Sequence, residues 1–301
     1  MSKARELANL RGTPTDSNIL LQSTAGDALT AGSGKCNIAM GINALGATTI
    51  GVCNIAIGVG AMYGVTTGQA DSNIAIGVSA LVGAAGTSGN DNIAIGRATA
   101  DALTTGACNI AMGSNSLSGA TSGNLNISIG DYSMGTGTTT GHLNVGIGQF
   151  AMEDATSGAC NVAIGQSVLK QMTCAGYNVA IGYQTMGAVA DQADSNVAIG
   201  VNALFGTADT AGNHNVAVGT STLFANTDGQ YNVAIGQQAG IANTTGNCNI
   251  AIGKCAGCTV STHTATINIG TVQGTTNSTT CIGGNCVMAT QFTATSDCRS
   301  K

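Results

Sequence analysis

Short apolar segments recur along this chain at nearly constant spacing, and within each one large aliphatic residues alternate with small or polar ones. The recurring unit is Asn, then Ile or Val, a small residue, then Ile, Met or Val, and a closing Gly. Alternation with a period of two predicts a β-strand with one buried face. The repeat Asn residues are Asn37, Asn54, Asn73, Asn92, Asn109, Asn126, Asn144, Asn161, Asn178, Asn196, Asn215, Asn232 and Asn249.

The step from one repeat Asn to the next is 17, 18 or 19 residues. Repeats this short and regular predict a solenoid, in which each repeat forms one coil stacked on the previous coil. We therefore expect an all-β fold, a β-solenoid or β-roll of about 14 coils over residues 18–270. Residues 1–17 are predicted to form an N-terminal attachment segment and residues 271–301 a C-terminal cap or tip. At the roughly 4.8 Å spacing of paired strands, the coils would build a rod about 70 Å long, with the Asn amides in a hydrogen-bonded ladder.

The unit NIAIGVSAL, residues 73–81, illustrates the expected packing of one coil. We predict that Ile74 and Ile76 fill the inside and that Ala75 points outward, so that the alanines form a smooth outer face. Leu81 and its equivalents, four residues after the Gly, add a second apolar contribution from the return segment. The closing Gly is predicted to need positive φ or to lack room for a Cβ. These structural glycines include Gly41, Gly58, Gly77, Gly96 and Gly113.

Such a coil has a thin interior of two aliphatic residues and one Leu or Met. At about 2 kcal/mol for each buried aliphatic side chain, their burial barely offsets the ordering entropy of one coil. Burial of the alanine face against other copies would supply the missing apolar area. We therefore expect a parallel homotrimer around the long axis.

The composition excludes several classes of function. Only 8% of the residues are charged and the formal net charge is −5. Between Cys36 and Asp297 the only basic residues are Arg97, Lys170 and Lys254, so we expect no nucleic-acid partner, because such a partner requires a basic surface. No apolar run approaches the roughly 20 residues of a membrane-spanning helix. Residues 1–11 lack the hydrophobic segment of a signal peptide, so neither membrane insertion nor secretory export is expected.

Candidate chemistry is sparse. His142, His214 and His263 have no companion acid or nucleophile at fixed spacing, and no glycine cluster has the spacing of a phosphate-binding loop. Of the 11 cysteines, five directly precede a repeat Asn, where other copies carry Asp, Leu or Tyr, so we interpret these thiols as filler. We expect no enzymatic activity, no cofactor and no metal.

Two sharper readings of these residues remain as alternatives. The spacing of Cys255, Cys258, Cys281 and Cys286 would be compatible with a zinc site, against disulfides or plain burial. The Thr-rich turns would suit ice binding if the folded rod aligned them in a regular two-column array.

The repeat resembles the repeats of viral and bacteriophage tail fibres, and also the shorter head repeats of trimeric autotransporter adhesins. The resemblance covers about residues 18–270 and rests on the NVAIG unit, the Leu that follows it and the TTG turn. It implies a trimeric β-solenoid that projects from a surface and contacts a cell. The final residues SDCRSK, Ser296 to Lys301, resemble the start of the endosialidase-type intramolecular chaperone that follows many phage fibre shafts. In that family a Ser and a Lys at this spacing serve self-cleavage. The sequence ends where that domain would begin, so we expect either that the sequence is truncated or that the six residues match by coincidence.

Together these features predict a structural virion appendage, a tail fibre or spike made in the host cytoplasm. Its N-terminal segment would attach to a baseplate, tail or other virion protein, and its tip would contact a glycan or protein receptor on the host. Cys281, Val287, Met288 and Phe292 are the candidate contact residues, because departures from a repeat mark a cap or a recognition end. The alternative is a cell-surface adhesin or a filament-forming protein without a receptor.

Overall fold

The computed structural model describes residues 10–11, 17–22, 24–30, 33–64, 70–83, 89–188, 193–206, 212–271, 279–282 and 285–288. Within these residues every regular element is a β-strand, so the predicted all-β solenoid is confirmed. The strands are β1 (Leu10–Arg11), β2 (Ile19–Leu21), β3 (Ile38–Met40), β4 (Ile55–Ile57), β5 (Ile74–Ile76), β6 (Ile93–Ile95), β7 (Ile110–Met112), β8 (Ile127–Ile129), β9 (Val145–Ile147), β10 (Val162–Ile164), β11 (Val179–Ile181), β12 (Val197–Ile199), β13 (Val216–Val218), β14 (Val233–Ile235), β15 (Ile250–Ile252), β16 (Ile267–Ile269), β17 (Thr279–Ile282) and β18 (Asn285–Met288).

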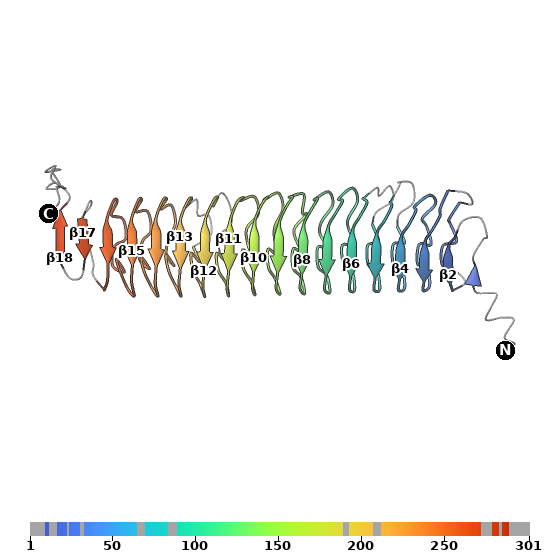
Figure 1. Ribbon diagram of the computed structural model, residues 1–301, viewed down its shortest axis with the longest axis horizontal. Coiled ribbons are helices and arrows are strands. Elements are labelled where there is room, and N and C mark those ends of the chain that lie inside the picture. Colours follow the sequence, from blue (N-terminus) through green and yellow to red (C-terminus); the bar gives the residue numbers. More distant parts are fainter. Residues whose placement is uncertain are drawn as a thin grey trace, which may run out of the picture.

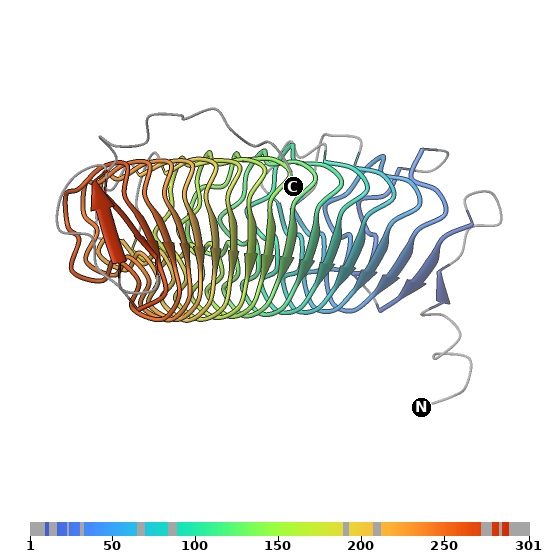
Figure 2. The ribbon, with the colours of Figure 1, turned by 60° about the vertical axis from the view of Figure 1, so that its left-hand side comes forward.

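Strands β2 to β17 form one continuous parallel ladder in which each strand pairs with the next strand in the sequence (Figure 1). The register never slips: Ile74 lies opposite Ile93, and Val162 lies opposite Val179. The 17- to 19-residue variation therefore falls in the connections, as predicted. The row of strands runs the length of a rod, and the return segments lie behind it (Figure 2).

Both ends of the ladder carry an antiparallel strand. At one end β1 pairs with β2, with Leu10 opposite Leu21. At the other end β17 and β18 pair, with Cys281 opposite Cys286. Because a reversed strand does not present the parallel edge of a coil, these two strands cap the solenoid.

The strands face the opposite way from the prediction. The middle residue of nearly every strand, such as Ala75 or Ala163, is fully buried, whereas Ile74 and Ile76 on either side of Ala75 are only half-buried. The predicted inward Ile pair and outward Ala are therefore wrong. The physical reason is that Ala75 has the same parity along the strand as Asn73, and Asn73 is buried by its hydrogen bonds to the neighbouring coils.

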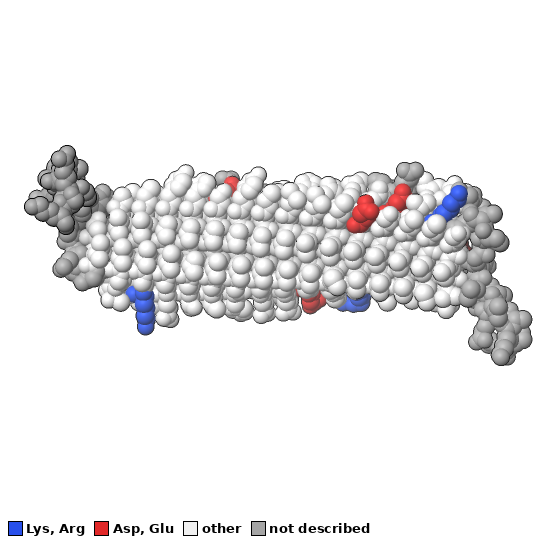
Figure 3. Space-filling model, viewed as in Figure 1, with Lys and Arg blue, Asp and Glu red and all other residues white. Residues whose placement is uncertain are grey.

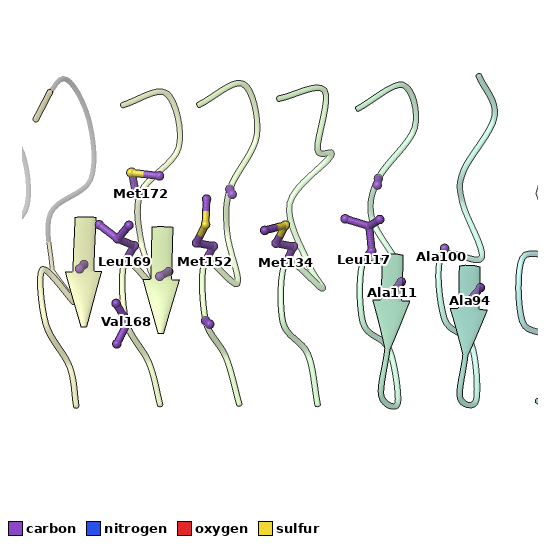
Figure 4. Close-up of a cluster of buried hydrophobic side chains, with 14 of the residues drawn as sticks. Ala94, Ala100, Ala111, Leu117, Met134, Met152, Val168, Leu169 and Met172 are labelled. Atoms are coloured by element: carbon purple, nitrogen blue, oxygen red, sulfur yellow. The ribbon is translucent and has the colours of Figure 1, made fainter. Parts of the chain in front are cut away.

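The interior of each coil is narrow and is filled from both walls. Buried Leu or Met side chains from the return segment, among them Leu117, Met134, Met152 and Leu169, pack against the strand alanines in a column along the rod (Figure 4). This second apolar contribution is as predicted. With a long side chain on one wall, only a small residue such as Ala fits on the other.

Two of the strands that lack the central Ala, β8 and β9, show how tightly this space is shared. Ser128 replaces Ala in β8, and its hydroxyl donates to the carbonyl oxygen of Ser133 at 2.7 Å, while the Ser116 hydroxyl donates to the carbonyl oxygen of Ser128 at 2.9 Å. In β9 the residue is Gly146, where a Cβ would lie 2.9 Å from the terminal methyl of Met134. The residues around Ser128 and Gly146 thus accommodate the replacement of the central Ala.

The glycine that closes each repeat adopts φ between 125° and 142°, a conformation that L side chains rarely adopt. At Gly200 an added Cβ would lie 2.6 Å from the carbonyl oxygen of Gly219 in the next coil. Both predicted reasons for glycine, positive φ and lack of space, are therefore confirmed.

A second corner of the coil was not predicted. The residue before each repeat Asn has φ of 57–61° although none of the thirteen is Gly. The side chain of an L residue costs roughly 1 kcal/mol in this left-handed region. The turn is nevertheless kept in coils that carry Cys, Ser, Asp, Leu, Tyr or His there, so backbone pairing between coils determines it.

Candidate interaction surface

The outer side of the ladder carries two columns of aliphatic side chains, the first and third residues of strands β2 to β16. We call this surface the aliphatic face. Its members are all Ile, Val, Leu or Met; most are half-buried and some are exposed, for example Ile19 at 49% and Ile235 at 40%. The aliphatic face is therefore an unbroken apolar surface along the rod.

The size of the aliphatic face exceeds what a soluble monomer exposes. Fifteen strands, β2 to β16, at about 4.8 Å each give a length of about 70 Å. A width of about 10 Å for two columns gives an area on the order of 700 Å² in projection, against largest patches of roughly 300–600 Å² on monomers. A standard protein–protein interface buries about 800 Å² on each partner. The face has the extent and chemistry of an interface.

Two edges border the aliphatic face. The leading edge consists of the residues directly before each repeat Asn, which are Cys36, Cys53, Ser72, Asp91, Cys108, Leu125, Leu143, Cys160, Tyr177, Ser195, His214, Tyr231 and Cys248. The trailing edge consists of the residues directly after each repeat Gly, which are Ile42, Val59, Val78, Arg97, Ser114, Asp131, Gln149, Gln166, Tyr183, Val201, Thr220, Gln237 and Lys254. The face seen in Figure 3 has charged side chains only near its long borders.

Beneath the aliphatic face runs the predicted ladder of Asn amides. The side-chain oxygen of Asn54 accepts the backbone N–H of Asn73 in the next coil at 2.9 Å, and the Asn54 amide donates to the carbonyl oxygen of Ala70 at 2.7 Å. The repeat Asn therefore satisfies backbone groups at the corner where the strand begins. Its burial and its polarity are both explained by this bonding.

A second polar ladder, which the sequence reasoning missed, lies just outside the first. Here the side chain two residues before a repeat Asn accepts a backbone N–H from the preceding coil. Asp71 accepts from Val52 at 2.9 Å, Asn124 accepts from Ala107 at 2.7 Å, and the Nδ1 of His142 accepts from Asn124 at 2.9 Å. The sequence contains a sign of this ladder, because Asn or Asp occurs frequently two residues before the repeat Asn. His142 thus has a structural role, as expected of a residue without catalytic companions.

The threonine turns align better than expected, and several of their hydroxyls bond to the neighbouring coil. Thr104, Thr156 and Thr227 occupy the same place in their coils, and each hydroxyl donates to the backbone carbonyl of the next coil, at 2.8, 2.9 and 3.1 Å. These hydroxyls hold neighbouring turns together. The geometry offers no support for the ice-binding alternative in the turns that the structure describes.

The candidate contact residues at the C-terminal end are only partly described. Cys281 in β17 is fully buried and disulfide-bonded, so its side chain is not available to a receptor. Val287 and Met288 belong to β18, and Phe292, like Ser296 and Lys301, lies outside the described residues. A thiol in a disulfide cannot act as a thiolate ligand, so a zinc site that uses Cys281 with Cys255, Cys258 and Cys286 is ruled out.

Elsewhere on the described surface, chemistry-bearing side chains are dispersed. Lys170 forms an ion pair with Glu153 at 3.0 Å and lies 5.1 Å from the ring centre of Phe150. His214 and Tyr231 stack with ring centres 4.9 Å apart. Over the described ranges no three His, Cys, Asp or Glu side chains are placed to share a metal ion, and no helix there could cross a membrane.

Family models, curated proteins and solved structures were all compared with this chain, and none of them matches it.

Proposed function

We propose that this protein is the shaft of a virion appendage, a tail fibre or spike, in which three parallel copies enclose their aliphatic faces. The observation that carries the proposal is the continuous aliphatic face on a straight solenoid. In a monomer this surface would remain in water, and the hydrophobic effect would drive copies together.

The outward orientation of the large aliphatic residues favours self-association more strongly than outward alanines would. Ala was expected on the outer face, but the outer columns carry Ile, Val and Met, which bury more apolar area per residue. The assignment of three copies rests on the resemblance of the repeat to tail-fibre and trimeric adhesin repeats.

A stiff spacer is the role that suits this architecture. Continuous pairing from β2 to β17 fixes each coil on its neighbours, and the dispersed polar side chains of the described region supply no catalytic arrangement. We assign attachment to a baseplate, tail or other virion protein to residues 1–17, host contact to residues 271–301, and no catalytic activity to the chain.

The filament alternative is less well supported. Indefinite end-to-end stacking needs a free parallel edge at each end of the ladder, but β1 and β18 cover those edges in the antiparallel sense. Discrete rods fit this capping better than long filaments.

Electron microscopy of the purified protein, combined with a binding assay, tests the proposal. We expect discrete rods of one length that bind a susceptible bacterial strain in a panel, and loss of binding when residues 271–301 are deleted. The deleted protein should keep its native mass and rod shape. Indefinite filaments would favour the alternative, and binding that survives the deletion would move host recognition to the shaft.

A further inference from the structure

We infer that Asp91 of one copy forms an ion pair with Arg97 of the neighbouring copy, and that this pair fixes the register in which the copies assemble. The inference rests on the proposed self-association through the aliphatic face and identifies which residues meet across it.

Asp91 and Arg97 belong to the same coil but lie at opposite edges of the aliphatic face. Asp91 is on the leading edge and Arg97 on the trailing edge, and both are exposed. The six-residue step between them spans the whole width of the strand, at most about 20 Å. They cannot pair within one chain. Arg97 donates to the hydroxyl of Ser114 at 2.8 Å, and neither residue has an ion-pair partner among the described residues.

Symmetry determines which edges meet. When copies are related by an axis parallel to the rod, the leading edge of one copy meets the trailing edge of the next, coil against identical coil. A two-fold axis perpendicular to the rod instead brings leading edge against leading edge. Only the parallel, in-register arrangement places Asp91 beside Arg97 of the next copy.

The two edges carry few charged residues, so two opposite charges at the same coil form a specific feature of this border. Asp91 is the only charged residue of the leading edge, and the trailing edge has Arg97, Asp131 and Lys254. At the coil of Asp91 the opposing residue is a cation. An ion pair that is partly removed from water at such a border is worth more than an exposed pair, and it discriminates against registers shifted by one coil, in which Asp91 would meet Val78 or Ser114 instead of a cation.

Disulfide trapping tests the register directly. Cys108 lies on the leading edge and is exposed as a free thiol, and Ser114 is the trailing-edge residue of the same coil. In the variant Ser114→Cys, mild oxidation of the assembled full-length protein should link Cys108 of one copy to the new thiol of the next. We expect covalent dimers and trimers on non-reducing gels, and their loss when Cys108→Ser is added.

Thr220→Cys is the matched control. Its coil has His214 on the leading edge, and the neighbouring coils have Ser195 and Tyr231, so no thiol is within one coil of it. This variant should give no more cross-linking than the wild type. Equal cross-linking from both variants, or none from Ser114→Cys in an assembled protein, would overturn the inferred register.

Charge reversal tests the ion pair itself. Arg97→Asp should weaken assembly by about tenfold in the dissociation constant at low salt, an effect on the order of 1.4 kcal/mol. The double reversal Asp91→Arg with Arg97→Asp should restore it, because the pair is rebuilt across the border. Failure of the double variant to recover affinity would contradict the ion pair.

The native mass separates the two proposals. A wild-type protein that is monomeric would refute the proposed assembly as a whole. A trimer of unchanged mass in which Ser114→Cys does not cross-link would refute only the register.

Discussion

The side-chain oxygen of Asn126 accepts the backbone N–H of Asn144, one coil further along, at 3.0 Å. The amide nitrogen of the same Asn126 donates to the carbonyl oxygen of Gly141 at 2.9 Å. One buried amide thus satisfies two backbone groups in the next turn of the solenoid. Repetition of this relationship along the rod holds the coils in register from the inside.

Asn126→Ala should therefore destabilise the fold by about 3 kcal/mol, because it leaves a buried N–H and a buried C=O without partners. Urea unfolding measures the change. The control is Asn124→Ala in the same coil, which removes a bond to the half-buried N–H of Ala107, a site that water can reach. It should cost less than about 1 kcal/mol. Equal costs for the two variants would argue against the inner ladder as the stronger one.

The repeat glycines give a second prediction. In Gly58→Ala the new methyl would collide with the carbonyl oxygen of Gly77, and φ is 132°. We expect a loss of about 3 kcal/mol or more in the free energy of unfolding.

Gly60→Ala serves as the control for Gly58→Ala. Gly60 has φ of 66°, and the nearest atom to an added Cβ is the Ser79 hydroxyl oxygen at 3.9 Å. The variant should therefore cost only about 1 kcal/mol. A Gly58→Ala protein as stable as Gly60→Ala would mean that the coils have room to separate.

The raised pKa of the Asp101 carboxyl predicts that the stability of the fold depends on pH. Burial raises the pKa of Asp101 above its ordinary value of 3.8, against the lowering effect of backbone hydrogen bonds at Asp101 and Ala102. The folded state then binds the Asp101 proton more tightly than the unfolded chain does. The stabilisation that comes from protonated Asp101 is fully present below pH 3.8, and it is lost as the pH rises through the folded-state pKa.

Asp101→Asn should consequently raise the melting temperature at neutral pH and leave it unchanged near pH 3, as scanning calorimetry at the two pH values would show. The exposed residue Asp228 offers a control, because Asp228→Asn should have little effect at either pH. A gain from Asp101→Asn that is the same at both pH values would contradict the role of the carboxylate charge.

The orientation of the strands supplies a fourth prediction. Ala111 is buried in β7 and Ile110 lies on the aliphatic face. Ala111→Ile should be destabilising by about 3 kcal/mol, because the interior beside Leu117 has no space for it. Ile110→Ala should leave the fold of the coil intact and weaken assembly instead. Urea unfolding and the concentration dependence of the native mass distinguish these effects, and the reverse pattern would restore the Ile-inside arrangement.

Fold class, coil length and the role of the repeat Gly could be predicted from the sequence because each depends on a regular local pattern. The facing of the strands could not be predicted from alternation alone, since a period of two is equally satisfied by either side. The decisive clue was Asn73: its amide must lie inside to reach the next coil, and Ala75 has the same parity. Burial and a shared hydrogen-bond ladder outweighed the preference for Ile over Ala in the core.

The sequence predicted an apolar surface for self-association but placed it on the wrong residues of each strand. Self-association was expected through alanines such as Ala75, but the exposed columns are those of Ile74 and Ile76. The left-handed corner at residues such as Tyr177 and the outer ladder through Asn124 arise only when coils stack, so no single repeat reveals them.

The native mass in solution tests the central claim most directly. Light scattering coupled to size-exclusion chromatography should give three times the chain mass of 29.4 kDa for the wild type. A variant with polar residues at Ile110, Ile127, Val145 and Val162 on the aliphatic face should shift toward the single-chain mass. A wild-type protein that stays monomeric at high concentration, with its aliphatic face in water, would contradict the account.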